Sequence, residues 1–247
     1  PTMPPGFFDA VGDTFRELAT RTDLRAVVLR SQCKHFSYGL DLPKTFATMG
    51  TLFTGAGLAG PRTELMRIIR RWQDCFSAVA DLPVPVIAAI HGWCIGGGLD
   101  LTSAADIRLA SADTRMSLRE ARIGIVADLG SLQRLPGIIG RAHTRELAYT
   151  AGDIDAERAA AIGLVNHVYP DRDAVHAAAD AMAREIASNP PLTVQGVKDV
   201  LRYGEGKTVQ EGLEYVSVWN SAFLQSEDLA EAISAFMAKR TPTYKGK

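Results

Sequence analysis

The sequence has little cysteine, almost no net charge and no long apolar run. Its 247 residues include three cysteines, and 27 Lys and Arg against 28 Asp and Glu leave a net charge of −1. Three cysteines without metal-type spacing argue against a disulfide scaffold and indicate reduced thiols, from which we predict a cytoplasmic protein. The balanced charge predicts no nucleic-acid or membrane-surface partner, and no apolar run approaches the ~20 residues of a membrane span.

Several catalytic and cofactor motifs are also missing. The five histidines show no paired metal spacing, so no metal site is predicted, and no GxSxG nucleophile elbow occurs. Glycines at 96–98 are contiguous rather than spaced as GxGxxG, which disfavours a dinucleotide-binding oxidoreductase. No signal-peptide pattern is present, and because the sequence starts at Pro1 rather than Met we expect residues to precede it.

Helix and strand patterns alternate in the first part of the chain. Helical spacing covers 7–19 and 64–80, and buried-strand patterns cover 25–30, 84–90 and 107–111, with an edge strand at 165–169. The Gly- and Thr-rich stretch 45–61 is predicted to be a loop that lines a pocket. From Asp173 onward the pattern is helical. We therefore predict an α/β core with a mostly parallel sheet over 1–188 and a helical region over 189–247.

The most unusual stretch joins an apolar strand to a glycine turn. Gly96, Gly97 and Gly98 follow the strand and open a short helix. Glycines let the backbone approach a ligand closely, and free N–H groups at a helix start favour negative charge. The turn can therefore bind a phosphate or a developing oxyanion, or it can simply be a tight turn with close helix packing.

Three carboxylates follow the glycines. Asp100 in the first helical turn is explained by capping alone, and Glu120 beside Arg119 and Arg122 by a solvated ion pair. Asp128, among apolar and small residues, is either a helix cap for 129–135 or a partly buried acid with a raised pKa. It is their occurrence together that makes Asp100, Glu120 and Asp128 candidate catalytic residues.

These features together resemble the enoyl-CoA hydratase/isomerase (crotonase) superfamily over nearly the whole chain. The matching segments are RAVVLRS with HFSYGLDL, then PVPVIAAIHGWCIGGGLDL, AADIRLAS, GSLQRLPGIIG, DAERAAAIGLVNHVYP and YKGK. The resemblance implies a repeated ββα spiral with a helical C-terminal trimerisation region, assembled as a homotrimer or homohexamer. It also implies an acyl-CoA thioester substrate, with CoA carried as part of the substrate and no further cofactor.

The resemblance also assigns binding residues. It implies an oxyanion hole for the thioester carbonyl, formed by the backbone N–H groups of Tyr38 and Gly97. Around them, the predicted substrate-binding residues are Gly39, Leu40, Asp41, Gly96 and Gly98. Lys245 in the basic C-terminal tail is a predicted phosphate clamp, although a solvated chain end explains that tail as well.

The acid pattern separates members of the superfamily. Hydratases typically carry Glu at the positions of Asp100 and Glu120, and glycine-rich sequence at that of Asp128. The spacing of the three acids and the segment IGIVADLGSLQRLP resemble dienoyl-CoA isomerases, which convert a 3,5-diene to a 2,4-diene. We predict that Glu120 removes the C2 proton, that Asp128 protonates C6 and that Asp100 supports both. The alternatives are an enoyl-CoA hydratase and a non-catalytic acyl-CoA-binding protein.

Overall fold

The computed structural model describes residues 1–54 and 59–247, which form two compact units. The first comprises Pro1–Thr22, Val28–Leu82 and Val86–Asp180, and the second comprises Asp23–Val27, Pro83–Pro85 and Ala181–Lys247. The predicted division at residue 188 stays a prediction. No helix in the described ranges is long and apolar enough to cross a membrane.

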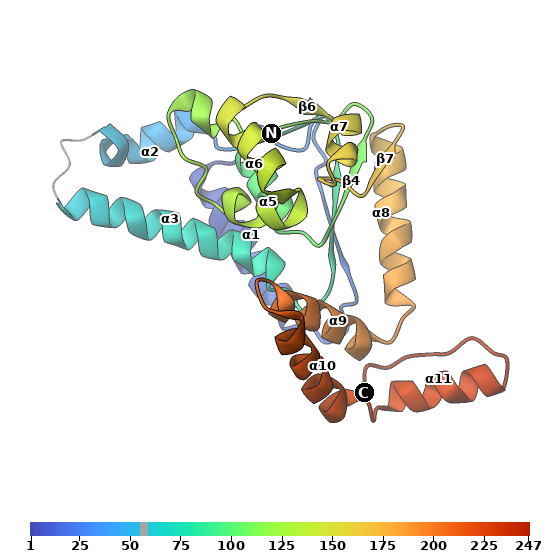
Figure 1. Cartoon of the computed structure of the whole chain (residues 1–247). Helices are drawn as coiled ribbons and strands as arrows, with labels where there is room; N and C mark the ends of the chain where they lie inside the picture. The colour runs from blue at the N-terminus through green and yellow to red at the C-terminus, as the bar shows by residue number, and fades with distance from the viewer. Residues whose placement is uncertain (55–58) are drawn as a thin grey trace. The chain divides into compact units, whose positions relative to one another are not determined.

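The first unit alternates strands and helices up to its last helix (Figure 1). In chain order its elements are α1 (Pro5–Ala19), β1 (Val27–Arg30), α2 (Leu42–Thr54), α3 (Ala59–Ala80), β2 (Val86–Ile90), β3 (Trp93–Ile95), α4 (Gly97–Ser103), β4 (Ile107–Ser111), β5 (Arg115–Ser117), the 3₁₀ helix η1 (Glu120–Ile123), α5 (Ser131–Ile138), α6 (Gly140–Thr150), β6 (Ile154–Asp155), α7 (Ala156–Ala161), β7 (His167–Tyr169) and the first part of α8 (Arg172–Ala187), which continues into the second unit from Ala181.

Two sheets organise this unit. The larger has the order β1-β2-β4-β7, in which β4 runs parallel to both β2 and β7, so β7 is the predicted edge strand. All five residues of β2 are buried, as the apolar run predicts for a strand covered on both faces. The smaller sheet has the order β3-β5-β6, with Ile95 opposite Ser117 in a parallel register.

An aromatic cluster joins α1 to α3, which lie against each other in Figure 1. The Phe8 ring stacks on Trp72 with 4.3 Å between centroids and lies 5.4 Å from Phe76. All three side chains are buried, which stabilises the pair by roughly 1.5–3 kcal/mol for each ring. The helical spacing of 7–19 is thus confirmed, and its apolar stripe faces α3.

Two elements differ from prediction. The stretch predicted as a loop from residue 45 is helical up to Thr54, while residues 55–58 lie outside the described part. Asp41 starts this helix α2, because its carboxylate accepts the Lys44 N–H (3.1 Å) and its carbonyl accepts the Thr45 N–H (2.8 Å). In addition, a strand not predicted from the sequence, β3, separates β2 from the glycine turn.

The second unit contains three further helices, α9 (Pro191–Gly204), α10 (Val209–Phe223) and α11 (Glu227–Met237). Gly196 lets α10 pack closely on α9, since a Cβ atom at this position would lie 2.2 Å from the Trp219 ring. A capping box at Thr208 and Glu211 begins α10. The buried Asp228 accepts the backbone N–H groups of Lys245 and Gly246 at 2.7 and 2.9 Å, which fixes the C-terminal tail to α11.

Candidate active site

The glycine turn places free backbone donors at the start of a buried helix. Gly96 takes φ +54°, a left-handed conformation that favours glycine, and acts as the N-cap of α4. Gly97 and Gly98 are the first residues of that helix, so their N–H groups have no intrahelical acceptor. A Cβ on Gly98 would lie 3.0 Å from the Ser37 Cβ, which is why this turn accepts no larger residue without movement.

The segment at 37–41 lies against this turn. Gly39 takes φ +78°, and a Cβ there would lie 2.7 Å from the Ile95 carbonyl oxygen and 3.1 Å from the Gly97 nitrogen. Conversely, a Cβ on Gly97 would lie 3.8 Å from the Leu40 nitrogen. The two segments therefore meet backbone to backbone, with the amides of Leu40 and Gly97 close together.

The assignment of Tyr38 as an oxyanion donor is wrong. Its N–H donates to the Pro1 carbonyl at 2.8 Å, and the next N–H, of Gly39, donates to the Ser37 Oγ at 3.0 Å. The N–H of Leu40 has no acceptor in the described ranges. Its neighbours complete a parallel bridge with Met3, which leaves the Leu40 amide pointing away from that bridge. Leu40, predicted only as a substrate-binding residue, is therefore the free donor beside Gly97.

Asp100 joins two helices by a buried hydrogen bond. It is 1% exposed, and its Oδ1 accepts the N–H of Ser131, the first residue of α5, at 2.7 Å. It caps the following helix rather than its own, so the simple capping explanation is incorrect. Burial is the main cause that raises the pKa of Asp100 to about 6; the hydrogen bonds with Ser131 act against it, and the charge of Asp128 adds to it.

Glu120, the first residue of η1, lies against the glycine turn. Its Oε1 would be 3.0 Å from a Cβ on Gly96, and its Oε2 is buried without a partner in the described part of the chain. The predicted ion pair with Arg119 does not form, since Arg119 makes a bidentate pair with Asp153. Burial raises the pKa of Glu120 to about 7, with further contributions from the charges of Asp100 and Asp128.

Asp128 is a partly buried acid and not a helix cap. It stands on the loop between η1 and α5, where Gly130 and not Asp128 is the N-cap residue of α5. Burial raises the pKa of the Asp128 carboxyl above its usual range. Asp100 binds the start of α5, three residues after Asp128, and Glu120 lies against Gly96, so the chain brings the three carboxylates together beside the glycine turn.

Two predicted binding residues have other contacts. Asp41 accepts hydrogen bonds from Lys44 and from the Thr2 hydroxyl (2.8 Å), and the Lys44 amide, the largest cause, lowers the pKa of Asp41. Through these contacts, Asp41 starts α2 and fixes the N-terminal segment. Lys245 belongs to the second unit, where its backbone binds Asp228, and its binding role stays a prediction.

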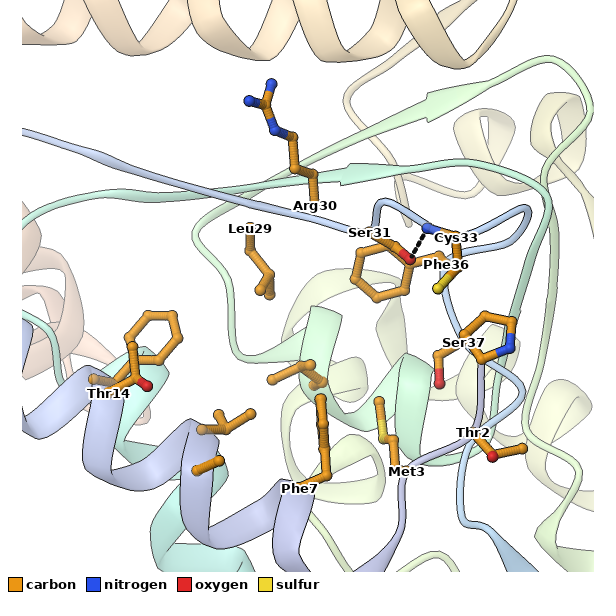
Figure 2. A pocket seen from close by; sticks show the side chains of 15 residues that line it. Thr2, Met3, Phe7, Thr14, Leu29, Arg30, Ser31, Cys33, Phe36 and Ser37 are labelled. Atoms are coloured by element: carbon orange, nitrogen blue, oxygen red, sulfur yellow. Dashed lines mark hydrogen bonds between the residues drawn. The ribbon is translucent and has the colours of Figure 1, made fainter.

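A separate cavity of about 530 Å³ lies between α1, β1 and the loop that follows β1. Phe7 and Leu29 project toward it from opposite sides (Figure 2). Met3 lines it as well, and the sulfur of Met3 would lie 3.3 Å from a Cβ on Gly97. None of the three carboxylates lines this cavity, so it is distinct from their site.

Comparison with known proteins agrees with this geometry. The family described as enoyl-CoA hydratase/isomerase matches residues 2–247. A mitochondrial Δ(3,5)-Δ(2,4)-dienoyl-CoA isomerase of Dictyostelium discoideum is 40% identical over 99% of this chain and 83% of its own. A peroxisomal one of Arabidopsis thaliana is 40% identical over 96% and 86%. A mitochondrial methylglutaconyl-CoA hydratase of Rattus norvegicus is 33% identical over 91% and 69%.

Solved structures share the fold. The crystal structure of an enoyl-CoA hydratase from Bacillus anthracis superposes with a TM-score of 0.89 and 29% identity, over 100% of this chain and 91% of that one. The predicted crotonase-like α/β fold is thus confirmed. The prediction of a cytoplasmic protein is wrong, because the similar dienoyl-CoA isomerases are mitochondrial or peroxisomal. The chain belongs to the enoyl-CoA hydratase/isomerase family.

Proposed function

We propose that this protein is a Δ(3,5)-Δ(2,4)-dienoyl-CoA isomerase. The observation that carries the proposal is the presence of three carboxylates with raised pKa at one site, beside two free backbone donors. Its relatives of that name are about 40% identical over nearly the whole chain, which supports the same reaction here. CoA enters as part of the substrate, and the proposed chemistry uses no further cofactor.

The two backbone donors stabilise the thioester oxygen. As a C2 proton leaves, negative charge develops on this oxygen, and the N–H groups of Leu40 and Gly97 are placed to bind it. A preorganised donor of this kind contributes about 3 kcal/mol to the transition state. Gly96 and Gly98 supply the close approach that brings the turn to the thioester, and Gly39 brings Leu40 to the turn.

Two carboxylates then shift the double bonds by one proton removal and one proton donation, and proton exchange with solvent afterwards returns Glu120 to its ionised form and Asp128 to its protonated form. Glu120 takes the C2 proton, for which its unpartnered Oε2 is available, and the electrons extend over the conjugated system to C6. The carboxyl of Asp128 gives a proton to C6, so that the 3,4 and 5,6 double bonds become 2,3 and 4,5. Burial is the main cause that raises the pKa of Glu120, and the charge of Asp100 adds to it, which makes Glu120 a stronger base once ionised.

A substrate comparison tests the proposal. Purified protein is incubated with a 3,5-dienoyl-CoA and, separately, with a 2-enoyl-CoA, and the ultraviolet absorbance of each is followed. We expect formation of the conjugated 2,4-dienoyl thioester and little loss of the 2-enoyl substrate. Hydration of the 2-enoyl-CoA without a diene shift would favour the second candidate, an enoyl-CoA hydratase, which the methylglutaconyl-CoA hydratase relatives make worth testing.

Two variants test the alternative of a non-catalytic acyl-CoA-binding protein. That alternative predicts that Glu120→Gln and Asp128→Asn leave function unchanged, whereas the proposed mechanism predicts loss of isomerisation in both.

Lys245 is proposed to bind a phosphate of CoA, because its side chain is exposed on a backbone fixed by Asp228. Lys245→Ala should then raise KM and leave kcat near its original value.

We further propose assembly into a homotrimer or homohexamer through the helical second unit. Large apolar side chains are exposed on its three helices, including Leu201, Val209, Leu213, Val218, Phe236 and Met237, with Val209 80% and Phe236 83% exposed. An apolar surface of this kind is typical of an interface between subunits. Light scattering after size-exclusion chromatography should give three or six chains, and a monomer at micromolar concentration would contradict the proposal.

A further inference from the structure

Asp128 stands on a loop whose own conformation does not fix it. The loop lies between η1 and α5 and is bounded by Gly124 (φ +75°) and Gly130 (φ +123°), both in the left-handed region. Val126 within it is 75% exposed. A proton donor on such a segment needs contacts with a rigid element, because an error of about 1 Å at a reacting group costs up to about 100-fold in rate.

Helix α3 supplies these contacts. The Gln73 Nε2 donates to the main-chain carbonyl of Asp128 at 2.6 Å. One helical turn later, the Ser77 Oγ accepts a hydrogen bond from Arg134 Nη2 at 3.1 Å, and Arg134 Nη1 donates to the Leu129 carbonyl at 3.3 Å. Residues 73 and 77 share one face of the helix, so two consecutive carbonyls of the loop are held to that face.

We infer that Gln73 is a positioning residue for the acid that protonates C6. This inference rests on the proposed isomerase function. The amide of Gln73 binds the backbone of Asp128 itself, directly beside the carboxyl-bearing Cα. Glu120, in contrast, stands on η1 and lies against Gly96, away from the loop residue that Gln73 binds. Removing the Gln73 donor therefore affects proton delivery at C6 and spares proton removal at C2.

The two half-reactions can be measured separately in D₂O. Removal of the C2 proton by Glu120 and its return from solvent place deuterium at C2 of recovered 3,5-dienoyl-CoA, which mass spectrometry detects. Completed transfer to C6 forms the 2,4-dienoyl-CoA, which absorbance detects. Gln73→Met keeps the side-chain volume and removes the donor. We expect it to lower 2,4-diene formation by about 10- to 100-fold, with exchange at C2 within about twofold of wild type.

A second variant separates positioning from general damage. In Gln73→Glu the side chain can donate to the Asp128 carbonyl only when it is protonated. The ratio of 2,4-diene formed to C2 exchange should therefore rise as pH falls in Gln73→Glu, relative to the same ratio in wild type. Both measurements require ionised Glu120, so the titration of Glu120 changes both and cancels in their ratio. Gln133→Met makes the same chemical change on the exposed side of α5 and should match wild type in both measurements.

Three outcomes would overturn the inference. In the first, Gln73→Met lowers C2 exchange and diene formation by the same factor, which means general damage to the site. In the second, Gln73→Met changes neither measurement, and in the third, the ratio for Gln73→Glu stays as low as that of Gln73→Met at every pH. Absence of 2,4-diene with the wild-type protein would instead refute the proposed isomerase, and the role of Gln73 with it.

Discussion

Burial of a catalytic carboxylate lowers the stability of the folded protein, and Glu120 allows this cost to be measured. Its pKa is raised from 4.5 to about 7, chiefly by burial. The Glu120 carboxyl of the folded protein thus keeps its proton over a pH range in which the same carboxyl in the unfolded chain has already ionised. Stability linked to Glu120 is fully present below about pH 4.5 and is lost as pH rises through about 7.

The raised pKa sets the size of the effect. A difference of about 2.5 pH units corresponds to about 3 kcal/mol, and partial exposure of Glu120 to solvent reduces this to about 2–3 kcal/mol. In Glu120→Gln the side chain at position 120 is neutral at every pH, so this variant does not lose stability in this way as pH rises. We therefore expect the free energies of unfolding of variant and wild type to diverge by about 2–3 kcal/mol between about pH 4.5 and pH 8, with the variant more stable at the alkaline end.

Urea unfolding followed by circular dichroism, at fixed protein concentration over this pH range, measures the divergence. Glu17→Gln, the same change on an exposed face of α1, serves as control and should run parallel to wild type. Parallel curves for Glu120→Gln and wild type would refute the reasoning, because they would mean that Glu120 is solvated in the folded protein. A gain in stability with a loss of isomerisation would identify a site whose acid is kept at a cost in stability.

Three further predictions follow from the geometry. Gly97→Pro removes one oxyanion donor at a helix position that accepts proline, so kcat should fall about 100- to 1,000-fold, while Gly97→Ala, which keeps the N–H, should lose far less. Asp100→Asn removes a negative charge that raises the pKa of Glu120, so the rising limb of the kcat/KM–pH profile should move toward acid, yet stay above 4.5 because burial is the larger cause. Gly196→Ala places a Cβ 2.2 Å from the Trp219 ring, so overpacking should cost about 1–3 kcal/mol in thermal or urea unfolding.

The apolar strand and the glycine turn could be predicted because their causes are local. The alternation of strand and helix up to β7 follows from side-chain periodicity, and β2 is buried along its whole length as its composition indicates. Helix α2 was missed although a local signal was present: Asp41 followed by Pro43 is a typical helix start, and the Gly and Thr residues further on obscured it.

The oxyanion donor could not be read from sequence because its cause is not local. Within residues 38–40, each N–H is equally available in the sequence. The structure separates them by contacts across long sequence distances, since Pro1 accepts from Tyr38 and Met3 forms its bridge at Leu40. The same is true of Asp100, whose acceptor role toward Ser131 joins residues 31 positions apart. Motif spacing located the segment, and tertiary contacts selected the residue within it.

Asp100 connects the geometry of the site with its acid strength. Its hydrogen bond to Ser131 fixes the start of α5 against α4, the helix that begins at Gly97, and so relates the loop of Asp128 to the glycine turn. Its charge, in the same buried position, raises the pKa of Glu120. A longer side chain at 100 would extend past the Ser131 amide, whereas an uncharged one would leave Glu120 a weaker base. An aspartate at this position meets both requirements at once, which gives a physical reason for the acid pattern that separates this chain from typical hydratases.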